Sequence, residues 1–192
     1  LGIPVFGPSA AAAEIEGSKA FAKDVMRAAG IPTAEYDTFT ELRPALYWAK
    51  ERGGRVVVKA DGLAAGKGVV VCGALAEVEE ALRAILVHRV HGDAGAKVVV
   101  EERLEGPEAS CICFTDGERV RLLAAAQDHK RIFDGDRGPN TGGMGAFAPS
   151  PLMTAALAEF TERRVVEQVL EGMRAEGEPY VGFLYVSLML TS

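Results

Sequence analysis

The sequence predicts an α+β protein with mixed or antiparallel sheets. Amphipathic stretches with helical spacing alternate with short β-branched runs along its 192 residues, of which 48% are hydrophobic and 25% are charged. Asp116 and Gly117 separate two strand-like runs, at 109–115 and 119–126, and this pair is a strong hairpin signal. A hairpin argues against a purely parallel sheet.

The remaining elements follow from hydrophobic spacing. A short helical pattern begins at Ser9, and a second helix begins near Ser18 and ends at Gly30, just before Pro32. Further helices are expected at 41–52, 74–87 and 155–175, and strands at 34–39, 55–60, 69–72, 98–101 and, as a buried strand, 180–190. Residues 33–99 have their own order of strands and helices, which predicts a small separate lobe.

Composition restricts the partners and the compartment. The formal net charge is -6, from 21 basic and 27 acidic residues, so nothing favours nucleic acid or a membrane surface as a partner. No apolar run approaches the roughly 20 residues of a membrane span. The three sparse cysteines are no disulfide framework and fit a cytoplasmic location, and Cys111 and Cys113 are expected to pack on one buried strand face.

The strongest signal for a phosphate site is the segment 59–68. Gly62, Gly66 and Gly68 lie between two valine-rich strands and let backbone N–H groups approach a phosphate, while Lys59 and Lys67 add positive charge. The spacing fits neither a P-loop nor a Rossmann fingerprint, because a strand follows the glycines. A strand–turn–strand cover over phosphates is therefore predicted, with an ordinary glycine hairpin as the alternative.

Two weaker signals accompany this loop. Lys19 at the start of a helix opposes the helix dipole, and a nearby anion would offset that cost. Residues 100–108 run from a buried strand into acids and a turn, where free backbone groups can pair with an adenine edge and Glu108 can bond a ribose hydroxyl. A charged surface turn is the alternative for this second segment.

Residues 127–151 are expected to form a long functional loop, because they are polar and rich in Gly and Pro. Their cations, amide and hydroxyl groups suit a phosphorylated substrate that carries a carboxylate. The sequence has no H-E-x-x-H, paired-cysteine or G-x-S-x-G pattern, so zinc and acyl-serine chemistry lack support.

These motifs resemble one family. Residues 127–131 (QDHKR), 138–146 (GPNTGGMGA) and 59–69 (KADGLAAGKGV) are similar to the phosphoribosylamine–glycine ligase (glycinamide ribonucleotide synthetase) family of the ATP-grasp superfamily. Residues 16–21 (EGSKAF) and 182–185 (GFLY) agree with it, so the resemblance covers nearly the whole chain.

The resemblance implies two α+β lobes that grip ATP, a main lobe at 1–33 plus 100–192 and a lid lobe at 34–99. It implies that Lys59, Lys130 and Arg131 take part in catalysis. The residues expected to bind ATP are Lys19, Lys59, Gly62, Gly66, Lys67 and Gly68 at the phosphates, Glu101 and Leu104 at the adenine through their backbone, and Glu108 at the ribose. The residues expected to bind the substrates are Asp128, His129, Lys130, Arg131, Asn140, Thr141, Gly142 and Gly143.

The resemblance also implies the reaction. In this family the carboxylate of glycine attacks the γ-phosphate of ATP to give glycyl phosphate, and the amine of 5-phosphoribosylamine then displaces phosphate. No protein nucleophile is needed, because the enzyme positions the reactants and stabilises charge. The family continues past the last strand into residues that hold Mg²⁺ or Mn²⁺, so no metal ligand is assigned here and the ligands are expected beyond Ser192.

The chain begins with Leu1 and ends soon after an apolar run, so it is expected to be a fragment that lacks N- and C-terminal domains and is inactive alone. Val186 and Ser187 stand where the family usually has Ala-Gly, and Phe147 where Tyr is common. Another ATP-grasp ligase or carboxylase and a non-catalytic nucleotide-binding module remain as alternatives.

Overall fold

A computed structural model describes residues 2–64, 67–135 and 137–191. Contacts within the chain divide it into two compact units. Unit 1 consists of Leu1–Ala13, Val25–Pro32 and Glu105–Ser192, and unit 2 of Glu14–Asp24 and Thr33–Leu104. Unit 2 takes in more than residues 34–99, because the segment around Ser18 hydrogen-bonds to Asp61 and the last strand of its sheet continues past residue 99.

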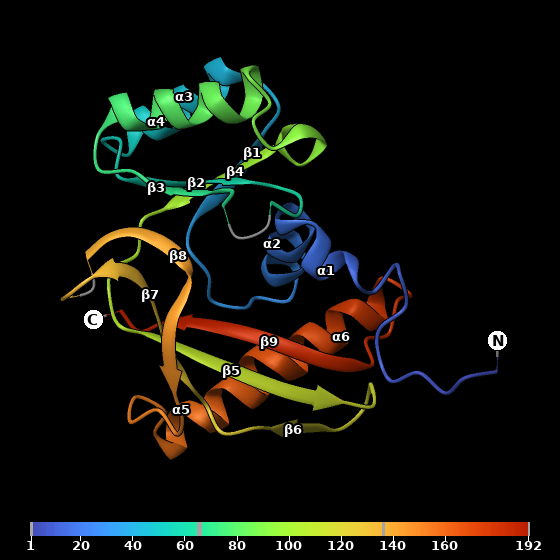
Figure 1. The fold of residues 1–192 in the computed structure, drawn as a ribbon. Helices are drawn as coiled ribbons and strands as arrows, with labels where there is room; N and C mark the ends of the chain where they lie inside the picture. The colour runs from blue at the N-terminus through green and yellow to red at the C-terminus, as the bar shows by residue number, and fades with distance from the viewer. Residues whose placement is uncertain (1, 65–66, 136, 192) are drawn as a thin grey trace. The chain divides into compact units, whose positions relative to one another are not determined.

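Unit 2 is built on an antiparallel sheet whose strands lie in the order β1 (Tyr36–Phe39), β4 (Val98–Glu102), β2 (Val56–Ala60) and β3 (Val69–Val71). Alternate residues of β2 are fully buried, whereas β4 is buried on both faces from Val98 to Glu101; the residues of one face are Val56, Val58, Ala60, Val98 and Val100. They pack against α3 (Leu42–Glu51) and α4 (Leu75–Leu82), which cover one face of the sheet (Figure 1).

The other face of this sheet meets the start of α2 (Lys19–Ala28). Ala20 of that helix forms a small buried cluster with Tyr36 of β1 and Val99 of β4. Lys59 lies on this same face, because it is directly opposite Val99 in the register. Glu101 does too, because it is two residues after Val99 along β4 and side chains alternate between the faces of a strand. The sheet therefore has one apolar face under α3 and α4 and one face that carries charge.

Unit 1 contains a second antiparallel sheet, with β5 (Glu108–Thr115) between β6 (Val120–Leu122) and β9 (Gly182–Met189). One continuous helical segment runs along it (Figure 1), made of α5 (Ala155–Phe160), a π-helical turn (Thr161–Val166) and α6 (Glu167–Ala175). Thr154 caps this segment by accepting a hydrogen bond from the Leu157 N–H at 3.2 Å.

The prediction of a long loop at 127–151 is wrong. Most of this segment pairs as an antiparallel hairpin of β7 (Gln127–Phe133) and β8 (Arg137–Phe147), with register shifts on both sides of Arg131. The pair was missed because it is polar and largely exposed, so it has no apolar alternation. Gly138, at φ 83°, supplies a backbone conformation that other residues avoid.

Other expectations are corrected in detail. The final strand is buried on one face only, since Phe183 and Tyr185 are 58% and 50% exposed. The strand expected at 119–126 ends at Leu122, and the pattern after Ser9 is a turn followed by the short α1 (Glu14–Gly17). The helix expected at 74–87 is confirmed as α4 plus a π-helical turn at Arg83–Val87, and a 3-10 turn follows at Gly92–Gly95.

The hairpin predicted at Asp116 and Gly117 is confirmed by the pairing of Thr115 with Val120. Cys111 and Cys113 are buried on one face of β5, as expected. None of the helices within the described residues combines the length and apolar character needed to cross a bilayer.

Candidate functional site

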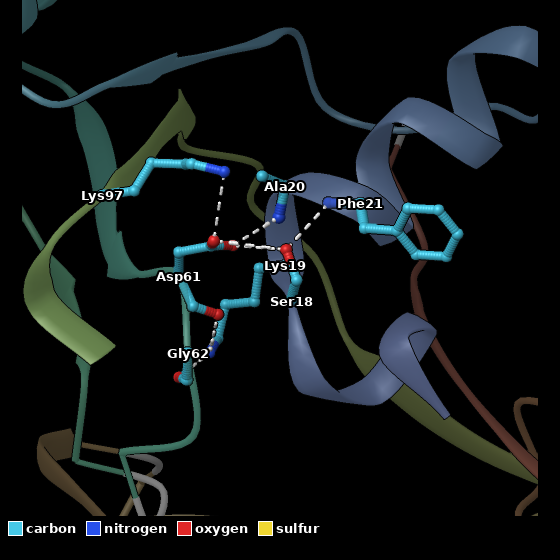
Figure 2. A network of polar contacts seen from close by, with 7 residues as sticks. All are labelled: Ser18, Lys19, Ala20, Phe21, Asp61, Gly62 and Lys97. Carbon is cyan, nitrogen blue, oxygen red and sulfur yellow. Dashed lines mark hydrogen bonds and ion pairs between the residues drawn. The ribbon is translucent and has the colours of Figure 1, made fainter. Parts of the chain in front are cut away.

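Asp61, directly after β2, anchors the N-terminus of α2 in unit 2. Its carboxylate accepts hydrogen bonds from the Ala20 N–H at 2.7 Å and from the Ser18 hydroxyl at 3.0 Å, and Lys97 Nζ lies 3.5 Å from it (Figure 2). A carboxylate at a helix N-terminus is favoured by the helix dipole and by the free N–H groups there. Asp61 is therefore the anion that offsets the unfavourable placement of Lys19.

Lys19 reaches back from α2 to the start of the glycine-rich loop. Its Nζ donates hydrogen bonds to the carbonyl oxygens of Asp61 and Gly62, at 3.3 and 3.0 Å. Burial lowers the pKa of Lys19, Asp61 partly offsets this, and the charge of Lys59 lowers the pKa further. Two ammonium groups thus lie near one another beside the loop, an arrangement that an added anion would stabilise.

Lys59 belongs to a group of three charges, of which the other two, Glu101 and Lys23, are buried. Its ammonium pairs with Oε1 of Glu101, whose Oε2 lies 2.7 Å from Nζ of Lys23. Burial alone would raise the pKa of Glu101, but the attraction of Lys59 and Lys23 outweighs it and holds that pKa below the usual range. The Lys59 side chain is 26% exposed, whereas those of Glu101 and Lys23 are each 9% exposed.

The glycines of the loop satisfy packing needs of the protein itself. A Cβ on Gly62 would lie 2.9 Å from Ala94 Cα, and one on Gly68 would lie 2.6 Å from the Ala64 Cβ. Lys67 is exposed, and Gly66 lies outside the described residues. The glycine pattern is therefore not specific for phosphate, and the partly buried Lys19 and Lys59 carry more of the argument.

Glu101 and Leu104 occupy different positions with respect to the sheet. Glu101 lies within β4, opposite Tyr36 of β1 and Val57 of β2, while half-buried Leu104 follows the end of that strand at Glu102. Their backbone contacts to adenine stay a prediction.

A cluster of polar side chains from β5, β7 and β9 lies in unit 1. Lys130 Nζ lies 3.1 Å from Glu108 Oε2 and 3.4 Å from Asp128 Oδ2. The Ser110 hydroxyl donates to Asp128 Oδ1 at 2.9 Å and lies 3.0 Å from the Tyr185 hydroxyl. Glu108, from one predicted motif, and Asp128 and Lys130, from another, are thus brought together.

The charges in this group stabilise one another. Burial lowers the pKa of Lys130, but its hydrogen bond to Glu108 and the neighbouring carboxylates outweigh burial, so its pKa is raised. For Asp128, burial acts in the opposite direction and raises the pKa. The hydrogen bond from Ser110 and the charge of Lys130 outweigh burial, so the pKa of Asp128 lies below its ordinary value. Lys130 and Asp128 therefore both carry their charges at neutral pH.

The other predicted substrate residues lie along the β7–β8 hairpin. His129 is exposed and stacks on Phe147, with ring centroids 5.9 Å apart. The Thr141 hydroxyl donates to the Lys130 carbonyl at 2.7 Å and accepts from the Gly143 N–H at 3.0 Å. In the strand register, Arg131 lies opposite Asn140, of which only the backbone is described. Gly142 is exposed.

Sequence reasoning missed Lys23, Asp61, Ser110 and Tyr185. Asp61 was predicted to open the glycine-rich turn and Tyr185 lies in the GFLY motif, but neither received a role. Within residues 2–64, 67–135 and 137–191, no group of three or more His, Cys, Asp or Glu side chains is placed to hold a metal ion.

The comparisons identify the family. Residues 17–192 match the model of the phosphoribosylglycinamide synthetase ATP-grasp (A) domain. The chain belongs to this family. The phosphoribosylamine–glycine ligases of Vibrio cholerae and Xanthomonas axonopodis pv. citri are 52% and 54% identical to it, over 100% and 98% of this chain and 44% of each relative. The resemblance noted in the sequence is thereby confirmed, and the chain spans less than half the length of these relatives.

Solved structures agree with this membership. The phosphoribosylamine–glycine ligase of Thermotoga maritima superimposes with a TM-score of 0.90 at 36% identity, over 98% of this chain and 48% of that one. The D-alanyl-alanine synthetase A of Vibrio cholerae gives a TM-score of 0.76 at only 16% identity, over 100% of this chain and 56% of that one, which shows a shared fold alone. The predicted α+β ATP-grasp fold is therefore confirmed.

Proposed function

We propose that this chain is the ATP-binding part of a phosphoribosylamine–glycine ligase. The intact enzyme would join glycine to 5-phosphoribosylamine, with glycyl phosphate as the intermediate and with glycinamide ribonucleotide, ADP and phosphate as products. The observation that carries the proposal is the partly buried pair Lys19 and Lys59 beside the 59–68 loop, in a chain 52% identical to such ligases.

The two lysines fit the phosphates of ATP. Lys19 is partly desolvated and held by carbonyl oxygens, so an incoming phosphate gains a charge-assisted hydrogen bond at little cost in ordering. Lys59 is oriented by Glu101 while part of its side chain faces solvent. Charge that develops on the transferred phosphoryl group would be stabilised by such fixed cations. Glu101 and Leu104 through their backbone, and Glu108 at the ribose, complete the proposed nucleotide contacts.

The unit 1 group is proposed to serve the other substrates. Lys130 and Arg131 would bind the phosphate of 5-phosphoribosylamine or the carboxylate of glycine, with Asp128 holding Lys130 in place. Asn140, Thr141, Gly142 and Gly143 of β8 would line the same substrates.

Mg²⁺ or Mn²⁺ would neutralise the phosphates in the intact enzyme. The described residues offer no set of clustered ligands for it. We propose that the metal ligands and the remaining domains lie outside these 192 residues, in the part of the relatives that this chain does not span.

Two experiments test the proposal. Calorimetry with ATP should show binding by the chain that Lys19→Met and Lys59→Met each weaken about tenfold, as loss of a charge-assisted bond predicts. The full-length protein that carries this segment should release ADP only when both glycine and 5-phosphoribosylamine are present. Turnover of bicarbonate in place of glycine would exclude the ligase and favour an ATP-grasp carboxylase.

A further inference from the structure

Lys23 is a buried cation that the proposed ATP contacts leave unexplained. It lies one helical turn after Lys19 on α2 and is only 7% exposed. Its Nζ lies 2.7 Å from Glu101 Oε2, donates to the Thr33 hydroxyl at 2.7 Å, and lies 5.1 Å from the centre of the Tyr36 ring. The ammonium is therefore fully coordinated by unit 2 and has no room for a ligand of its own.

Stability alone gives no reason for a charge at this position. Burying an ammonium and a carboxylate costs several kcal/mol per ion, and apolar side chains of similar volume often serve as well or better. The surroundings would accept one, because α2 packs on this face through Ala20 against Val99. A role for the charge itself is the stronger explanation.

The charge of Lys23 changes what Lys59 can offer to a ligand. The Glu101 carboxylate uses one oxygen for Lys59 and the other for Lys23, so the three groups together keep one positive charge. Without Lys23, the negative charge of Glu101 would cancel the positive charge of Lys59. Lys59 is the most exposed of the three, so the surplus charge is available where a ligand can reach it.

We propose that Lys23 is a positioning residue that neutralises Glu101 and thereby leaves the positive charge of Lys59 free to bind the phosphates of ATP. The proposal rests on the proposed function, because it assigns Lys59 to an anionic ligand. It adds a determinant of phosphate affinity that never touches the nucleotide.

A purely structural role is the competing explanation. Lys23 also lies 3.4 Å from the Ala34 carbonyl oxygen and bonds to Thr33, so it ties α2 to the segment before β1. The two explanations differ when the charge of Glu101 is removed together with that of Lys23. Charge balance predicts recovery in the double variant, because Lys59 is again uncompensated, whereas loss of a tether predicts none.

The test measures binding of Mg²⁺-ATP and of inorganic tripolyphosphate by calorimetry to the 192-residue chain. Lys23→Met should weaken both ligands about tenfold, the effect of cancelling one nearby charge. Lys23→Met combined with Glu101→Gln should return both affinities to within about threefold of the wild type. Lys50→Met, which removes an exposed lysine from α3, is the matched control and should change neither.

The outcomes separate the two proposals. A double variant as weak as Lys23→Met, or weaker, would overturn the role inferred for Lys23, as would wild-type affinity in Lys23→Met. A wild-type chain that binds neither ligand would overturn the assignment of Lys59 to phosphate, and with it the inference. Urea unfolding of each variant identifies any loss of binding that comes from loss of folding.

Discussion

Replacing Asp61 tests the link between the glycine-rich loop and α2. Its carboxylate accepts hydrogen bonds from the Ala20 N–H and the Ser18 hydroxyl, and its side chain is 14% exposed. Asp61→Ala removes a helix cap worth about 1 kcal/mol. It also deprives the buried Ser18 of a charged acceptor, which adds about 1–2 kcal/mol. The free energy of unfolding of unit 2 should therefore fall by about 2–3 kcal/mol.

Two further variants separate the contributions. Asp61→Asn keeps an acceptor but loses the charge, so it should cost about half as much. Lys97→Met removes only a half-exposed partner at 3.5 Å and should cost less than about 0.5 kcal/mol. Urea unfolding followed by the fluorescence of Trp48, the single tryptophan, reports on unit 2 because that residue lies on α3. The reasoning is refuted if Asp61→Ala costs no more than Lys97→Met.

A tight glycine, the buried thiols and the Glu101 carboxylate can each be tested by one substitution or one reagent. Gly68→Ala should destabilise unit 2 by about 1–3 kcal/mol in the same assay, because its Cβ would lie 2.6 Å from that of Ala64. Gly73→Ala, also in unit 2, would bring its Cβ only to 3.6 Å from Arg103 and is the control; equal effects would contradict the steric argument. Burial raises the pKa of Cys72 to about 11, and all three thiols are buried, so Ellman's reagent at pH 8 should label the chain quickly only in urea; rapid labelling of the native chain would be inconsistent with this. The pKa of Glu101 in the folded protein lies below its ordinary value of 4.5, so the ionised carboxylate stabilises the fold above pH 4.5, and this stabilisation is lost as the pH falls through the folded-state pKa. Glu101→Gln should therefore reduce the fall in the free energy of unfolding at acid pH. An unchanged dependence of stability on pH would argue against the coupling.

The sequence predicted unit 2 well because its strands are apolar and β-branched. The valine runs predicted as strands contain the fully buried Val56, Val58 and Val100, and the helices over them have the expected spacing. The β7–β8 hairpin could not be predicted in this way, because its stability does not come from a buried apolar face. Residues such as Gly143 and Gly145 adopt positive φ there and mimic a loop signal.

The candidate site was predicted in part. Motifs named Lys19, Lys59, Glu108 and Lys130, but no motif indicated that Glu108 and Lys130 pair with each other. Lys23 received no role from the sequence, since its partner Glu101 is distant in sequence. Local spacing carries no information about such a contact.

The strand order of unit 2 has a consequence for folding kinetics. β2 and β3 are neighbours in sequence and can pair as a local hairpin, whereas β4 must return across the α4 segment to enter between β1 and β2. Bringing β4 beside β1 and β2 closes long segments of chain, which costs conformational entropy before the contacts that offset this cost can form. Lys59 and Glu101 lie on the two strands joined in this slower step, so the charged face should assemble late, after the local hairpin is in place.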